Sequence, residues 1–164
     1  NRFDREKAID ETFAAEAIDL ELANARVIGP VKVSGSAIKG SSSVGIKGRL
    51  TAALEIDCDR CLESVEHAIE IELDLEFAPK QQLEGDSSLE LHGDDMKFDA
   101  IDGSELDLAE IVREQIVLDV PQQFFCSEDC KGLCEKCGTN LNLKDCECED
   151  NEIDPRWAAL KNLN

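Results

Sequence analysis

Aromatic side chains are scarce in this sequence. Six Phe, one Trp and no Tyr make up 4% of its 164 residues. Proteins that bind single-stranded nucleic acid usually stack the bases on aromatic side chains. The composition therefore argues against recognition of RNA by base stacking.

Residues typical of catalytic sites are also few. The two histidines, His67 and His92, form no metal-binding pair, and no Gly-Lys-Ser/Thr phosphate-binding loop is present. A catalytic zinc ion usually keeps one position open for water, which a set of four protein ligands does not provide. We predict no catalytic residues and a non-enzymatic protein. The alternative left open is a zinc-dependent or thiol-redox enzyme that uses a Cys-x-x-Cys pair.

The sequence has no apolar run of the ~18 residues that a membrane-spanning helix needs, and no charged leader followed by an apolar stretch. We therefore expect a soluble, intracellular protein without a membrane partner. Because the chain starts at Asn1 and not at Met, the expected location is the bacterial cytoplasm, or the plastid stroma if a transit peptide has been removed.

Positive charge is in short supply, with 17 Lys and Arg against 37 Asp and Glu and a net charge of −20. Such a charge opposes nonspecific binding to phosphates or to membrane surfaces. One segment differs, because residues 22–54 contain no acidic residue. Its cations are the candidate RNA contacts, namely Arg26, Lys32, Lys39, Lys47 and Arg49.

Cysteine, by contrast, is abundant and closely spaced, which predicts zinc as a cofactor. A Cys-x-x-Cys turn can aim two thiolates at one ion, and four thiolates complete a closed structural site. The spacing favours one site of Cys134, Cys137, Cys146 and Cys148, and a second of Cys58, Cys61, Cys126 and Cys130. One zinc ion with alternative ligands and free thiols also fits, as do disulfides or an iron–sulfur cluster.

Two segments alternate between apolar and polar residues, as half-buried strands do. They are residues 44–58 and 65–77, and the Cys58–Cys61 turn between them predicts a hairpin. With Cys58 opposite Cys61, Leu50 faces Ile69. The same register places Arg49 opposite Glu70 and Lys47 opposite Glu72.

The remaining elements are predicted from local signals. We expect a strand over 30–39 before a loop at 40–43, a strand over 17–28 after a short helix, an acidic loop at 79–95, and a short strand at 96–101. A helix is expected from Ser104 towards Pro121, with Asp107 as capping-box partner. A terminal helix follows Asp154. The apolar stripe expected for the first helix is Leu108, Ile111, Val112, Gln115 and Leu118, and Trp157 and Leu160 should dock the terminal one.

These elements predict an α+β fold, an antiparallel β-sheet with a covering helix and a cysteine-rich, zinc-binding C-terminal appendage. The α+β domain should span residues 1–121, and the zinc-binding tail residues 122–164.

Several motifs together resemble the YceD-like family, the large ribosomal RNA subunit accumulation proteins. They are CDRCLE after the long alternating strand, LDLAEIVREQIVLDVP, CSEDCKGLCEKCGTNLN with the later CEC, and DPRWAALKNL, within residues 30–164. The resemblance implies a ribosome-biogenesis factor that supports accumulation or processing of large-subunit (23S-type) rRNA in bacteria or plastids, and it carries over no catalytic residue.

Two mechanisms fit this resemblance. The acidic protein can contact a basic ribosomal protein or a pre-50S particle, or residues 22–54 can contact rRNA directly. The net charge favours the protein or particle, with weak binding to naked rRNA.

Overall fold

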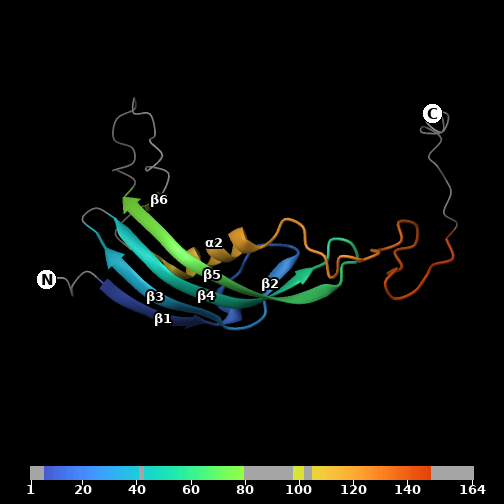
Figure 1. The fold of residues 1–164 in the computed structure, drawn as a ribbon, viewed down its shortest axis with the longest axis horizontal. Helices are drawn as coiled ribbons and strands as arrows, with labels where there is room; N and C mark the ends of the chain where they lie inside the picture. Colours follow the sequence, from blue (N-terminus) through green and yellow to red (C-terminus); the bar gives the residue numbers. More distant parts are fainter. Residues whose placement is uncertain (1–5, 41–42, 80–97, 102–104, 149–164) are drawn as a thin grey trace, which may run out of the picture.

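The computed structural model describes residues 6–40, 43–79, 98–101 and 105–148. Within these residues the chain forms a curled six-stranded sheet and one α-helix (Figure 1). The predicted antiparallel sheet with a helix is confirmed, except that the last strand joins in parallel. The elements are β1 (Glu6–Phe13), a 3-10 turn (Ala15–Ala17), β2 (Ala25–Val27), β3 (Val31–Lys39), β4 (Val44–Asp57), β5 (Ser64–Pro79), β6 (Phe98–Ile101) and α2 (Leu108–Asp119).

The long strand β4 is the centre of the sheet. Along its whole length it pairs with β5, and its other edge pairs with β3 over residues 44–51 and with β2 over residues 54–56. The strand order is β1-β3-β4-β5-β6, with only β5 and β6 parallel. Leu50, Leu54 and Ile56 of β4 are fully buried, so the predicted apolar face is confirmed.

The hairpin register differs from the predicted one by two residues. Leu50 pairs with Ile71 and not with Ile69, and the last pair is Asp57 with Ser64. A shift of two residues keeps every side chain on its face, so the alternation alone cannot detect it. The turn decides the register, because Leu62 adopts a left-handed conformation (φ 59°) and the N–H of Cys58 donates to the carbonyl of Glu63.

The N-terminal segment is a strand where we expected a short helix. Ile9 and Phe13 lie on its core-facing side, and a spacing of four residues fits both a helix and a strand. Backbone pairing with β3 decides between them. The strand expected over 17–28 is limited to β2, although Ile18 and Leu20 before it are buried.

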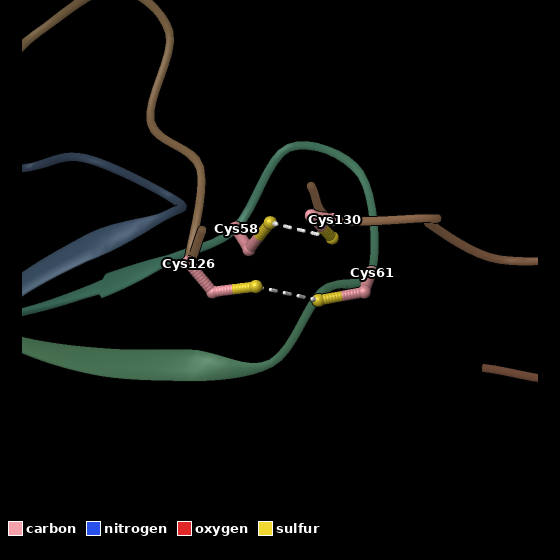
Figure 2. A group of neighbouring side chains, drawn as sticks. All are labelled: Cys58, Cys61, Cys126 and Cys130. Atoms are coloured by element: carbon pink, nitrogen blue, oxygen red, sulfur yellow. Dashed lines mark hydrogen bonds between the residues drawn. The ribbon is translucent and has the colours of Figure 1, made fainter. Parts of the chain in front are cut away.

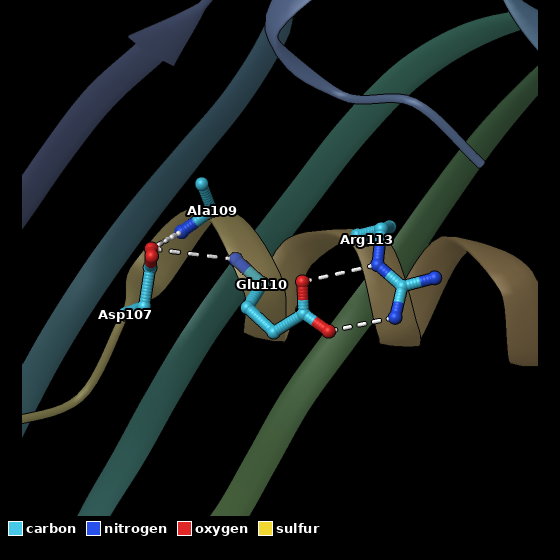
Figure 3. Close-up of polar contacts among 4 residues, drawn as sticks. All are labelled: Asp107, Ala109, Glu110 and Arg113. Carbon is cyan, nitrogen blue, oxygen red and sulfur yellow. Dashed lines mark hydrogen bonds and ion pairs between the residues drawn. The ribbon is translucent and has the colours of Figure 1, made fainter. Parts of the chain in front are cut away.

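Helix α2 begins at Leu108, four residues after the expected Ser104. Asp107 is itself the N-cap, since its carboxylate accepts from the N–H groups of Ala109 (2.9 Å) and Glu110 (3.4 Å) (Figure 3). Figure 3 also shows the ion pair between Glu110 and Arg113 one turn later. Aspartate caps a helix as well as serine does, so residue type alone does not favour Ser104 over Asp107.

The buried side of α2 also differs from the predicted stripe. Ile111, Val112 and Ile116 are buried in the same hydrophobic cluster as the strands. Leu118 is 77% exposed, so its predicted place in the stripe was wrong. Gln115 is half-buried, and Ile116 rather than Leu118 completes the face that Ile111 and Val112 begin.

The other expected elements fall partly outside the described residues. The 96–101 strand is present as β6, and the 40–43 loop is closed by a hydrogen bond from the N–H of Gly40 to the carbonyl of Ser43. The acidic loop expected after Pro79 and the terminal helix expected after Asp154 lie outside the described residues. The division into residues 1–121 and 122–164 stays a prediction. In the part of the chain that is described, no helix has the length and apolar character to cross a bilayer.

We predict that Ile116→Ala lowers the free energy of unfolding by about 2–5 kcal/mol, because it leaves a cavity in the shared core. The matched substitution Leu118→Ala on the same helix should change it by less than about 0.5 kcal/mol. Urea denaturation under reducing conditions measures both free energies of unfolding. Equal losses in the two variants would contradict the burial of the Ile116 side of α2 against the sheet.

Candidate metal centres

Four cysteines meet at the turn between β4 and β5. Cys58 and Cys61 belong to the turn, and Cys126 and Cys130 come from the segment that follows α2 (Figure 2). Their sulfur atoms all lie within 4.8 Å of one another, with Cys58 Sγ 3.8 Å from Cys130 Sγ and Cys61 Sγ 3.6 Å from Cys126 Sγ. We call these four residues the turn cluster.

These distances fit one metal ion. A tetrahedron of sulfurs, each ~2.3 Å from a central zinc ion, has edges of about 3.8 Å, whereas the sulfurs of a disulfide are ~2.05 Å apart. A group this compact has room for one ion at its centre but not for the iron and sulfide atoms of a cluster. The turn cluster could therefore hold a single metal ion.

Backbone contacts bring the later segment to the turn. The N–H of Asp59 donates to the carbonyl of Phe124 (2.9 Å), and the N–H of Phe124 donates back to the Asp59 carboxylate (2.7 Å). The ring of Phe124 also meets His67 edge-on, with 5.5 Å between centroids. His67 is thus packed against Phe124 and belongs to neither group of candidate metal ligands.

Arg60 binds the segment on the other side of the turn. Its guanidinium donates to the carbonyls of Glu128 (3.2 Å) and Cys130 (3.0 Å) and lies over the ring of Phe125 (4.2 Å). Its own carbonyl accepts from the N–H of Leu133. No sequence pattern singled out Arg60, although it is a cation inside a turn flanked by two cysteines.

The other four cysteines form a second group. Cys134, Cys137, Cys146 and Cys148 also place their sulfur atoms within 4.8 Å of one another. We call them the tail cluster. The eight cysteines are thus gathered into the two groups of four that their spacing favoured.

The two Cys-x-x-Cys turns have the same backbone structure. The N–H of Leu62 donates to the carbonyl of Cys58 (2.9 Å), as that of Gly138 does to Cys134 (2.8 Å). The N–H of the first cysteine in each turn donates to the carbonyl of the residue five positions later. Cys58 donates to Glu63 (3.0 Å), and Cys134 donates to Thr139 (2.8 Å). Leu62 and Gly138 both adopt a positive φ. Glycine adopts this conformation freely, whereas leucine adopts it only with strain. Both turns therefore share a backbone geometry suited to placing two cysteine sulfurs on one metal ion, and the first contains a leucine in a left-handed conformation.

The thiols of each cluster influence one another's ionisation. Burial raises the pKa of Cys58, but hydrogen bonds from the N–H groups of Cys126, Cys61 and Arg60 lower it to about 6. The N–H of Glu63 favours the Cys61 thiolate, yet burial and the neighbouring thiols raise its pKa to about 12.

The tail cluster shows the same contrast. Hydrogen bonds with the side chain and backbone of Thr139 lower the pKa of Cys137 to about 6, whereas the adjacent Cys137 sulfur, followed by burial, raises that of Cys148 to about 12. Thiols this close do not all ionise unless a cation compensates their charge. The donor sets are therefore suited to a divalent metal.

Three of the five candidate RNA-contacting cations are engaged in ion pairs. Arg26, which had no predicted partner, pairs with Glu55, and Lys47 pairs with Asp74 (3.0 Å). Arg49 contacts both Glu70, as predicted, and Glu72 (3.8 Å). Lys32 and Lys39 form no ion pair with a described residue.

We predict two zinc ions per chain, one for each cluster. Replacing Cys134 and Cys137 by Ser should remove one, and replacing Cys58 and Cys61 should remove the other, because each pair supplies half of one ligand set. Elemental analysis of purified protein measures the ratio. Unchanged zinc in either double variant would contradict the assignment.

Leu62→Gly should raise the free energy of unfolding of the metal-loaded protein by about 1 kcal/mol, because it relieves a left-handed conformation that glycine adopts freely. Leu62→Ala keeps the strain and removes an exposed side chain, so it is the matched control and should give no gain. Denaturation at fixed free zinc distinguishes them, and equal effects would indicate that Leu62 is unstrained.

Comparison with known proteins finds relatives in bacteria and in plants. An uncharacterized protein of Bacillus subtilis (strain 168), YlbN, is 30% identical over 162 residues, covering 94% of this chain and 86% of the relative. The large ribosomal RNA subunit accumulation protein YCED homolog 1, chloroplastic, of Arabidopsis thaliana is 27% identical over 156 residues, or 82% of this chain, and its namesake in Zea mays is 26% identical over 174 residues, or 91% of this chain.

The match to the two plant proteins covers only 48% and 58% of their respective lengths. No solved structure matches the chain. The family model described as large ribosomal RNA subunit accumulation protein YceD matches residues 46–164 and includes all eight cysteines. Since this match covers well over half of the sequence, the chain belongs to the YceD family of large ribosomal RNA subunit accumulation proteins.

Proposed function

We propose that this protein is a non-enzymatic ribosome-biogenesis factor that supports accumulation or processing of large-subunit rRNA, with two structural zinc ions and a basic ribosomal protein or pre-50S particle as its partner. Membership of the YceD family supports the ribosomal role. The observation that carries the proposal is the pair of compact four-cysteine clusters within the matched region. They are suited to holding structure and leave no ligand position for water.

Zinc is the metal that the ligand chemistry favours. Four thiolates in a tetrahedral arrangement are soft ligands typical of structural zinc. In the described residues after α2, only Cys130 and Gly132 are buried, so this segment has almost no hydrophobic core of its own. Metal binding of ~10–16 kcal/mol is a sufficient source of folding energy for such a segment.

The outer face of β5 favours a basic partner. Glu66, Glu70, Glu72, Asp74 and Glu76 alternate along it and are all exposed. Lys47 and Arg49 neutralise part of this charge, but five carboxylates facing two cations leave the surface acidic. A basic ribosomal protein offers the complementary charge, which steers association and fixes orientation.

The distribution of cations argues against a site for naked RNA. Lys32 and Lys39 are seven residues apart in β3, which at ~3.4 Å per residue is about 24 Å. An odd separation also places them on opposite faces of the strand. Lys32 and Lys39, the two candidate cations that form no ion pair with a described residue, therefore do not form a joint phosphate-binding patch.

The alternative is a zinc-dependent or thiol-redox enzyme. The lowered pKa of Cys58 is a property of redox cysteines. However, Cys58 and Cys61 lie between two antiparallel strands, and two further cysteines surround them. That arrangement favours a closed metal site over a free dithiol.

We expect the full-length chain, used as bait in cell lysate, to capture a basic ribosomal protein or a pre-50S particle. The ribosomal protein should stay bound after the lysate is treated with RNase. Replacing Glu66, Glu72 and Glu76 by Gln should weaken capture about tenfold, since three exposed charge contacts of about 0.5 kcal/mol each sum to about 1.5 kcal/mol. Quantitative mass spectrometry of the bound fraction measures the change.

The matched control replaces Glu6, Asp10 and Glu11 of β1 by Gln, Asn and Gln, which changes the net charge equally on another strand. It should leave capture unchanged. Loss of all capture after RNase, together with submicromolar binding of isolated rRNA at physiological salt, would replace this proposal with direct RNA recognition.

A further inference from the structure

The loop between the two halves of the tail cluster is attached to the turn cluster. Asn142 lies in this loop, between Cys137 and Cys146. Its side-chain Nδ2 donates to the sulfur of Cys130 (3.2 Å), and its Oδ1 accepts from the N–H of Lys131 (2.8 Å). A residue of one cluster's loop thus contacts a sulfur of the other cluster directly.

Other contacts hold the same loop in place. The N–H of Leu141 donates to the carbonyl of Gly132 (2.9 Å), and Asn140 forms an isolated β-bridge with Leu133. The side chain of Asn140 also donates to Glu63 in the β4–β5 turn (3.2 Å). The loop therefore spans both Cys-x-x-Cys turns, and its position depends on both.

We propose that Asn142 is a positioning residue that couples the two metal sites, so that a metal ion in the tail cluster strengthens metal binding by the turn cluster. This inference rests on the metal binding proposed above. It adds that the two sites are not independent and that one side-chain amide transmits the effect.

The coupling has a simple physical origin. A metal ion in the tail cluster links Cys137 to Cys146 and closes the loop that contains Asn142, which restricts the positions that the loop samples. Asn142 is then already oriented towards Cys130, where its N–H stabilises the sulfur as a thiolate ligand. Partners outside the ligand set typically change metal affinity by 10–100-fold. By linkage, metal in the turn cluster must strengthen binding by the tail cluster by the same factor.

The test is a Co²⁺ titration of the full-length, reduced, metal-free protein, followed by the sulfur-to-cobalt charge-transfer absorption. The turn cluster is measured alone in a chain with Cys134→Ser and Cys137→Ser, and independently in one with Cys146→Ser and Cys148→Ser. Asn142→Ala removes both hydrogen bonds. Asn142→Asp keeps the acceptor for Lys131 but replaces the donor to Cys130. Leu143→Ala, at the neighbouring and 77% exposed position, is the matched control.

We expect loss of the tail cluster to weaken Co²⁺ binding by the turn cluster about tenfold. Asn142→Ala and Asn142→Asp should weaken it similarly, and combining either with loss of the tail cluster should add little. Both variants should also shift the charge-transfer band of the turn cluster, since the sulfur of Cys130 loses its N–H donor. Leu143→Ala should change neither property.

The outcomes separate this inference from the proposed function. Two bound Co²⁺ ions with independent affinities, or an unchanged affinity and spectrum in both Asn142 variants, would overturn the coupling and leave the metal sites in place. Failure of the unaltered chain to bind two ions would overturn the metal assignment itself, and the coupling with it.

Discussion

Four sulfur atoms brought within 4.8 Å of one another at the β4–β5 turn are the constraint on which the rest of the structure depends. They join positions 65 and 72 residues apart in the sequence, Cys61 with Cys126 and Cys58 with Cys130. As thiolates they repel one another, and a divalent cation converts this repulsion into attraction. The same four residues therefore account for the path of the chain after α2 and form a group that could hold a metal ion.

The hairpin connects this turn to the rest of the molecule. One face of β4 and β5 forms the core with Leu50, Leu54 and Ile56, and the opposite face of β5 presents its carboxylates to solvent. Arg60 and Asn142 connect the segment after α2 to the turn cluster. Arg60 donates to the backbone carbonyls of Glu128 and Cys130, and Asn142 donates to the sulfur of Cys130. An acidic strand face, together with two cysteine groups that could each hold a metal ion, suits the assembly role with a basic partner proposed above.

Much of this architecture could be predicted from the sequence because alternation and ligand spacing have direct physical meaning. Alternation identified the faces of β4 and β5, and the spacing of the cysteines favoured the two groups that the structure contains. The register required the left-handed conformation of Leu62, which leucine rarely adopts and no pattern indicates.

Other features depend on contacts made only in the folded chain. Ile9 and Phe13 fit a helix or a strand equally well until β3 supplies backbone partners. Ser104 and Asp107 are equivalent caps by residue type, and whether Leu118 lies in the buried stripe depends on which side of α2 packs on the strands. The roles of Arg60 and Asn142 consist of contacts to backbone carbonyls and to a sulfur from a distant segment, which a linear sequence does not reveal.

Zinc K-edge X-ray absorption on the purified full-length protein tests the central claim most directly. The account predicts that every bound zinc ion is surrounded by four sulfur atoms at ~2.3 Å, with no oxygen or nitrogen ligand. An average coordination that includes oxygen or nitrogen, or reduced protein without bound zinc, would contradict it.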